Sequence, residues 1–202
     1  MQVLLSNVGM RVISLCFFTL LAVSRPVPAP AQAPAGPVGA FGAALNGLQL
    51  RIIPVTSGSG LPADVKLDVT LENVRGSDFV LNLGTMLANA KVMWPDAIRL
   101  MLTDASGQRR ELRFSSRTGG VAGRIDDYVV ALRAGSTYTV RVSLDDYMRD
   151  GAAKLANGRY KIAAQFIGRR ASGVNVDMQG VALLNFWTGT AHSNVAEFEV
   201  SR

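Results

Sequence analysis

Alternating apolar and polar residues dominate the chain from residue 48 onward. In the clearest run, Val65, Leu67, Val69 and Leu71 alternate with Lys66, Asp68, Thr70 and Glu72. A period of two puts successive side chains on opposite faces, so the run predicts a strand with one buried face. The same alternation recurs in seven further stretches: 48–52, 79–83, 98–102, 128–132, 138–144, 160–166 and 196–200.

Glycine beside a small or polar residue separates these runs, as at Asp104–Gly107 and Ala156–Gly158. Such dipeptides permit the positive φ of tight turns. Short strands joined by such turns predict an all-β fold, an antiparallel sandwich of the immunoglobulin or fibronectin-III-like type with about seven to nine strands.

The residues beyond such a sandwich fall into two loop-like insertions, 84–95 and 169–194, where binding residues are expected because loops on a rigid scaffold carry function. We expect short helical turns in the insertions and connections, at Thr85–Ala90 and Asp146–Leu155.

The N-terminus has the pattern of an export signal. Arg11 precedes the uncharged apolar run Val12–Val23, which is shorter than a membrane span and is followed by small residues at spacings that permit cleavage. We therefore expect a signal peptide and processing region over 1–35, with cleavage best placed after Ser24 or Ala35. An uncleaved membrane anchor is the alternative.

The remaining boundaries follow from composition. Residues 36–47 are rich in glycine and alanine and predict a flexible linker, and 48–202 predicts the sandwich domain. Cys16 is the only cysteine and lies in the signal, so the mature chain would form no disulfide. Removing Arg11 and Arg25 lowers the formal charge from +6 to +4. Export predicts a periplasmic or extracellular protein with no transmembrane segment after cleavage. Because the excess of positive charge is mild and the protein is exported, we expect it to bind no nucleic acid.

Two short motifs resemble those of bacterial immunoglobulin-like domains. Leu132–Tyr138 resembles the turn that enters a strand as L-x-x-G-x-x-Y, and Leu155–Tyr160 resembles a tyrosine corner built on Leu155, Gly158 and Tyr160. In that corner the tyrosine hydroxyl bonds to nearby backbone. The order of motifs is similar to that of the BsuPI-type proteinase-inhibitor domain and of other secreted sandwich domains. The chain lacks the tryptophan that this family carries after the hairpin, in Gln108–Phe114.

The inventory of catalytic groups is small. His192 is the only histidine and is expected in a loop, so we predict no metal site, no cofactor and no catalytic triad. Carboxylate pairs are the remaining route to chemistry, since paired acids hydrolyse glycosidic bonds. These acids are Asp126, Asp127, Asp145, Asp146 and Asp150. We interpret them as turn-capping residues and predict that the protein is not an enzyme.

Two surfaces are candidates for binding. Arg109, Arg110 and Arg113 lie on one predicted hairpin and would attract an anionic partner, or would simply keep a sheet face solvated. Phe186 and Trp187, near Met178, would form an exposed aromatic anchor if they do not close the end of the core.

These features predict a non-catalytic binding or accessory domain of the cell envelope. Its expected partner is a protein, and a peptidase is one form that the partner could take. The alternatives are a carboxylate-based glycan hydrolase and a carbohydrate-binding module that uses Phe186 and Trp187 as a platform for an envelope glycan.

Overall fold

A computed structural model describes residues 39–56, 65–87, 91–115, 123–148, 155–171, 180–181 and 183–201. The chain divides into two units, Met1–Ala33 and Pro34–Arg202, and every described residue belongs to the second. The predicted signal lies outside the described residues. Within these residues, no helix is long and apolar enough to cross a membrane.

The described residues form ten strands and short 3-10 segments, so the all-β class is confirmed. The count lies above the seven to nine strands expected. The strands are β1 (Leu48–Thr56), β2 (Val65–Asn73), β3 (Phe79–Leu87), β4 (Val92–Trp94), β5 (Ile98–Thr103), β6 (Arg109–Arg113), β7 (Ile125–Leu132), β8 (Thr137–Ser143), β9 (Gly158–Gly168) and β10 (Gly189–Val200), and the 3-10 helix η2 covers Leu144–Tyr147.

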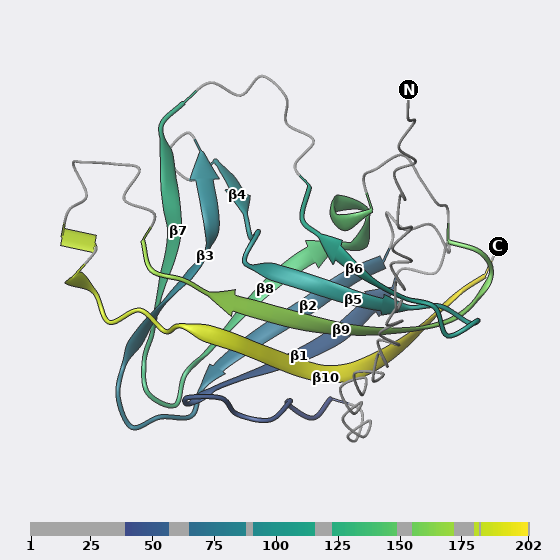
Figure 1. Ribbon diagram of the computed structural model, residues 1–202, viewed down its shortest axis with the longest axis horizontal. Coiled ribbons are helices and arrows are strands. Elements are labelled where there is room, and N and C mark those ends of the chain that lie inside the picture. The colour runs from purple at the N-terminus through teal and green to yellow at the C-terminus, as the bar shows by residue number, and fades with distance from the viewer. Residues whose placement is uncertain are drawn as a thin grey trace, which may run out of the picture. The chain divides into compact units, whose positions relative to one another are not determined.

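The strands make three antiparallel sheets, with the orders β1-β2-β8, β10-β9-β5-β6 and β4-β3-β7. Residues of all three sheets, mainly of the first two, share one hydrophobic core. The third sheet rises away from one end of the others, at the left of Figure 1. The described residues thus form a sandwich with an added ribbon.

The buried residues follow the predicted alternation. Val65, Leu67, Val69 and Leu71 of β2 are buried, and the inward residues of β1, β5 and β9 are buried with them. Thr70 departs from the pattern because it is buried although polar. Its hydroxyl lies 3.0 Å from that of Thr139 on β8, so a cross-strand hydrogen bond satisfies it.

Asn73 forms the corner from which the third sheet departs. Its side chain is fully buried, and its amide nitrogen donates to the carbonyl oxygens of Ser77 and Leu132. Its backbone also bonds to Ser136 and Gly135, in the turn between β7 and β8. One residue therefore ties the β2–β3 turn to the β7–β8 turn, which lets β3 and β7 pair with each other in a separate sheet.

Asn194 joins the two main sheets at their edges. It lies in a β-bulge of β10, where the register shifts between His192 and Val195. Its side-chain amide accepts from the Ile52 N–H at 2.8 Å and donates to the Ile52 carbonyl at 3.2 Å. The side chain thus pairs with β1 as a peptide group of a neighbouring strand would.

Residues 39–47, which fall in the predicted linker, lie against β1 and β10. The Gly42 N–H donates to the Leu50 carbonyl, and the guanidinium of Arg51 lies 4.7 Å from the centre of the Phe41 ring. A Cβ on Gly42 would overlap the carbonyl of His192. Only glycine permits this close approach.

The predicted helical turns have two outcomes. Thr85–Leu87 belongs to strand β3, so a helical turn there is wrong, and 88–90 lies outside the described residues. Strand pairing with β4 and β7 outweighs the local helical preference of this stretch. The second predicted turn, Asp146–Leu155, overlaps the 3-10 helix η2 at residues 146–147. Residues 149–154 of it lie outside the described part of the chain.

Candidate functional site

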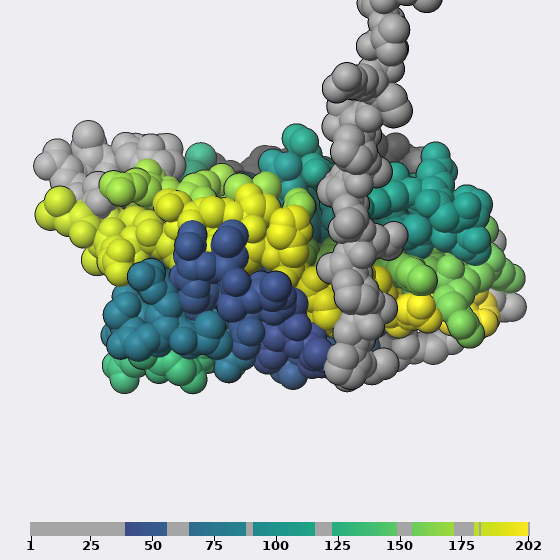
Figure 2. Space-filling view, turned by 60° about the horizontal axis from the view of Figure 1, so that its bottom comes forward, coloured from purple at the N-terminus to yellow at the C-terminus, as the bar shows by residue number. Residues whose placement is uncertain are grey.

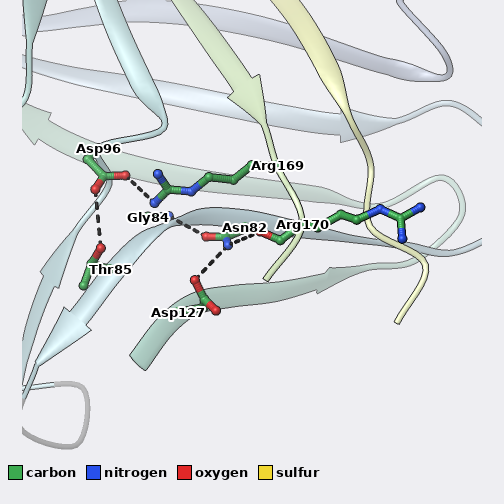
Figure 3. Close-up of polar contacts among 7 residues, drawn as sticks. All are labelled: Asn82, Gly84, Thr85, Asp96, Asp127, Arg169 and Arg170. Atoms are coloured by element: carbon green, nitrogen blue, oxygen red, sulfur yellow. Dashed lines mark hydrogen bonds and ion pairs between the residues drawn. The ribbon is translucent and has the colours of Figure 1, made fainter. Parts of the chain in front are cut away.

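A buried asparagine organises the base of the added ribbon. Asn82 is fully buried and sits where the β3–β7 register shifts, next to Gly84. Its amide nitrogen donates to Asp127 Oδ1 on β7 and to the carbonyl of Arg170 after β9, both at 3.0 Å. Its amide oxygen accepts from the Gly84 N–H at 3.1 Å (Figure 3). Asn82 thereby connects three segments that are far apart in the sequence.

An ion pair reinforces this connection. Arg169 donates to Asp96 Oδ1 at 2.7 Å, and the Thr85 hydroxyl donates to the other oxygen of Asp96 at 3.4 Å (Figure 3). Both charged side chains are partly exposed, so the pair orients the chain more than it stabilises the fold. The bulge itself requires Gly84, because φ is +147° there and a Cβ would overlap the Trp94 carbonyl.

The C-terminal end of the predicted insertion 169–194 is hydrogen-bonded to β3. The Val80 N–H donates to the Asn185 carbonyl, and the Val80 carbonyl accepts from the Trp187 N–H, each at 2.9 Å. The Asn185 side chain also donates to the Asp78 carbonyl at 3.1 Å. We call the contacts of Asn82, Arg169 and Val80 the clamp, because they fix both ends of the insertion on the same ribbon.

Trp187 is buried and closes the end of the core. It is 3% exposed, its ring lies 5.6 Å from that of Phe166, and its indole N–H donates to the Asn46 carbonyl at 3.3 Å. Gly168 faces the ring so closely that a Cβ there would overlap it. The exposed aromatic anchor and the sugar platform were therefore wrong for Trp187, because its large apolar surface is buried against the core.

Phe186 is half-buried, and two leucines before it face solvent. Leu183 is 88% exposed and Leu184 is 44% exposed. We call these three residues, Leu183, Leu184 and Phe186, the apolar rim. Of these, the sequence predicts a binding role for Phe186 but for neither leucine, and Met178 lies outside the described residues.

Two neighbouring turns extend this apolar surface. Leu45 and Val74 are 41% and 48% exposed. The Val74 N–H donates to the Gly47 carbonyl, and Trp187 bonds to Asn46, so the three segments meet. Figure 2 shows them together at the left of the view, in yellow-green, dark blue and blue-teal.

The predicted arginines lie on β6, an edge strand. Arg109, Arg110 and Arg113 are exposed, and Leu112 faces the core. Arg113 and Arg99 of β5 both donate to the same oxygen of Glu111, at 2.8 and 3.1 Å. These guanidinium groups hold the pKa of Glu111 below its usual value, with the hydrogen bond from Arg113 as the main cause.

The tyrosine corner has the predicted geometry. Leu155 and Tyr160 are buried, and the Tyr160 hydroxyl donates to the Ala156 carbonyl at 2.9 Å. Gly158 adopts φ of +149°, a conformation that favours glycine. These residues position the start of β9.

The acidic pairs lie on separate elements. Asp126 and Asp127 belong to β7 of the added ribbon, and Asp145 and Asp146 belong to η2 after β8 (Figure 1). Asp150 lies outside the described residues. Asp127 accepts from Asn82, so it has a structural role.

His192 lies in strand β10 and not in a loop as predicted, because the strand continues through the bulge at Asn194. Its exposed ring has Nδ1 3.4 Å from Gln165 Nε2. Among the described residues, no group of three or more histidines, cysteines and acids could hold a metal ion.

Two tyrosines have raised pKa values. Tyr147 of η2 is buried, its hydroxyl has no hydrogen-bond partner among the described residues, and its ring packs edge-on against Phe114. Burial is the main cause that raises its pKa, and the charges of Asp146 and Asp96 add to it. Tyr128 is also raised, first by burial and then by its 2.6 Å hydrogen bond with the Tyr138 hydroxyl.

Sequence reasoning missed the buried asparagines that hold the site together, Asn73, Asn82 and Asn194. Asparagine is depleted in strands, so an asparagine inside an apolar alternation was the available signal. Asn82 stands between Leu81 and Leu83 in such a run. Its partners, however, come from strands that only the fold brings near.

No family model and no curated protein match the sequence. Three solved structures show weak likenesses. The X-ray structure of Northeast Structural Genomics Consortium target SoR45 has a TM-score of 0.36 and 13% identity, over 78% of this chain and 90% of that one. The putative ApaA protein from Bordetella pertussis has a TM-score of 0.34 and 12% identity, over 82% of this chain and 97% of that one.

The third likeness is to a β-glucosidase from Listeria innocua in complex with gluconolactone. Its TM-score is 0.33 at 15% identity, over 90% of this chain but only 20% of the enzyme. With TM-scores this low, these likenesses support no statement about fold type or activity.

Proposed function

We propose that the protein is an exported, non-catalytic binding domain with an immunoglobulin-like sandwich, and that it recognises a protein partner through the apolar rim. The exposure of Leu183 carries this proposal. An 88% exposed leucine, beside Leu184 and the half-buried Phe186, is an apolar surface on a segment that the clamp holds in place.

The physical argument concerns the cost of binding. Single exposed apolar side chains are common, but several that adjoin one another mark interaction sites. Association loses affinity when a loop must be ordered first. Hydrogen bonds on both sides of Val80 already fix the backbone next to the rim, which lowers that cost.

The strand order supports the immunoglobulin-like type. In such domains strands A, B and E share one sheet, while C, F and G share the other. Here β1, β2 and β8 take the places of A, B and E, and β5, β9 and β10 take those of C, F and G. The Tyr160 corner belongs to the same type. The added β3–β7 ribbon then serves as the support for the rim.

The place of action rests on the N-terminal pattern. An uncharged apolar run after Arg11, followed by small residues, predicts export to the periplasm or the exterior. Mass spectrometry of the protein recovered outside the cytoplasm should show an N-terminus after Ser24 or Ala35. Recovery of the full-length chain in the cytosol would contradict export.

The binding proposal is tested by site-specific photocrosslinking in cells that make the protein. A photoreactive amino acid at position 183 should give a discrete adduct with another protein. The same group at position 55 is the matched control, because Val55 is an exposed apolar residue near the opposite end of β1. Adducts of equal yield at both positions would contradict a specific rim.

Serine variants give a second measurement. Leu183→Ser with Leu184→Ser should reduce capture of the crosslinked partner at least tenfold, while Val55→Ser should leave it unchanged. Neither change touches the core, so all variants should unfold at the same urea concentration. Unaltered capture by the double variant would refute the proposal.

Inhibition of a peptidase is one form of this function, suggested by the resemblance to BsuPI-type domains. The purified domain should then slow at least one peptidase of the same compartment, and the serine variants should relieve that effect. Full activity of all peptidases tested would remove this form and leave the binding proposal intact.

A further inference from the structure

The outer face of the β10-β9-β5-β6 sheet presents a transverse row of polar side chains. In the strand registers Arg113 lies opposite Arg99, Arg99 opposite Gln165, and Gln165 opposite His192. The row therefore crosses all four strands. Three interstrand steps of about 4.8 Å give it a length of about 14 Å.

One end of this row carries excess positive charge. Arg99 and Arg113 donate to a single oxygen of Glu111, so three charged groups leave a net charge of +1. Arg113 is 73% exposed at its side chain, and Arg99 and Glu111 are about one third exposed. Two guanidinium groups that converge on a carboxylate oxygen can hold a second carboxylate from a ligand, because each retains further N–H donors.

The other end of the row is neutral and polar. Gln165 is half-buried and His192 is exposed, with Gln165 Nε2 3.4 Å from His192 Nδ1. An amide and an imidazole can bond to hydroxyl groups as donors or acceptors. Such groups suit a ligand that has hydroxyls as well as carboxylates.

A parallel apolar row lies beside the polar one. Met101, Ala163 and Val195 face each other across β5, β9 and β10, and all three are half-buried. Ala163, on the central strand of the three, has the smallest side chain. The C–H face of a sugar ring can pack on such a strip while its hydroxyls reach the polar row.

We call the four side chains Arg113, Arg99, Gln165 and His192 the polar row. We infer that the polar row binds a glycan chain that carries carboxylate groups. The carboxylate would bind between Arg99 and Arg113, and the neutral hydroxyls would bind at Gln165 and His192. The neutral groups at Gln165 and His192 and the adjacent apolar strip favour a glycan over an acidic peptide. The inference is independent of the rim, because it concerns another sheet and other residues.

Calorimetric titration of the purified chain with oligogalacturonate tests the inference. Neutral galactan oligosaccharides and poly-glutamate of matched length are the comparison ligands. We expect oligogalacturonate to bind at least tenfold more tightly than either. Equal binding of poly-glutamate would overturn the glycan assignment, and no binding of oligogalacturonate at millimolar concentration would overturn the site.

Variants assign the binding to the row. Arg99→Gln with Arg113→Gln should weaken oligogalacturonate binding at least tenfold, and Gln165→Ala should weaken it severalfold. The matched control is Arg133→Gln, which removes a charge from the exposed β7–β8 turn and should have no effect. An equal loss with Arg133→Gln would show attraction to overall charge alone and would refute the inference.

The protein crosslink at the apolar rim is measured separately from oligogalacturonate binding. Leu183→Ser with Leu184→Ser should leave oligogalacturonate binding unchanged, and the arginine variants should leave the protein crosslink at position 183 unchanged. Either proposal can therefore fail without the other. Circular dichroism and urea midpoints equal to the parent protein confirm that each variant is folded.

Discussion

At the scale of the residue, the hydrogen bonding of single buried polar groups affects the stability of the fold. Two tyrosines, Tyr147 and Tyr160, are both buried but differ in hydrogen bonding. The Tyr160 hydroxyl donates to the Ala156 carbonyl, whereas the buried hydroxyl of Tyr147 has no hydrogen-bond partner in the part of the chain that the structure describes. A satisfied hydrogen bond stabilises modestly, while an unsatisfied buried group costs its full desolvation.

The two tyrosines therefore predict opposite effects of the same substitution. Tyr160→Phe should lower the free energy of unfolding by about 1 kcal/mol, since it leaves the Ala156 carbonyl without its donor. Tyr147→Phe should be neutral or should stabilise by about 1 kcal/mol, because it removes the unpaired hydroxyl. Urea unfolding of both variants measures this. Destabilisation by Tyr147→Phe similar to that by Tyr160→Phe would contradict the assignment.

Asn194 gives a second prediction at this scale. Asn194→Ala leaves the N–H and the carbonyl of Ile52 without partners in a buried place, and should cost about 1–3 kcal/mol. Calorimetric unfolding provides the measurement. Asn157→Ala in an exposed turn is the control and should change stability little. An effect of Asn194→Ala no larger than that of the control would show that β1 and β10 hold together without this side chain.

At the scale of the element, alternation fixes the buried face of a strand but not its neighbour. Each of the strands β1, β2, β5 and β9 buries the residues that its own pattern predicts. The pairing of β3 with β7 required a bulge at Asn82–Gly84 and a corner at Asn73, both of which depend on contacts far along the chain. The sequence consequently predicts most of the strands, but it predicts neither β4, in the stretch 84–95 expected to be a loop, nor the ribbon that β4 belongs to.

Strand pairing also sets the pH dependence of the β2–β8 contact. Asp68 lies opposite Arg141 and accepts two hydrogen bonds from it, at 2.7 and 2.8 Å. The hydrogen bond from Arg141 is the main cause that lowers the pKa of Asp68. A lowered pKa in the folded state gives stability that is present above the ordinary pKa and is lost as the pH falls through the folded value.

The stability advantage of the parent protein over Asp68→Asn should therefore be full at pH 7. It should shrink as the pH falls below about 4. Because both side chains are partly exposed, the advantage is small and should shrink further in high salt. Urea midpoints at pH 7 and pH 3 measure it. An advantage that grows on acidification would contradict this account.

At the scale of the whole molecule, residues 39–47 complete the sandwich edge. Phe41 lies over the guanidinium of Arg51, and Gly42 and Leu45 bond to the backbone of β1. The segment thus adds backbone hydrogen bonds and a cation–π contact to the edge of β1.

A chain that begins at Leu48 should therefore be less stable than one that begins at Gly36, by about 2 kcal/mol for the lost hydrogen bonds and cation–π contact. Thermal unfolding of the two chains measures the difference. Phe41→Ala in the longer chain should reproduce part of the loss. Equal stability of the two chains would show that 36–47 acts only as a linker.

The sequence by itself determined the all-β class, the buried face of most strands and the tyrosine corner, because period-two alternation and turn glycines are local signals. The tertiary structure alone decided that Trp187 is buried and Leu183 exposed, since both depend on how 183–187 lies against β3. It also placed Arg99, Arg113, Gln165 and His192 in one row, because strand register joins residues that the sequence separates by many positions. Local pattern fixes which side of a strand faces inward, and only long-range pairing fixes what the other side presents.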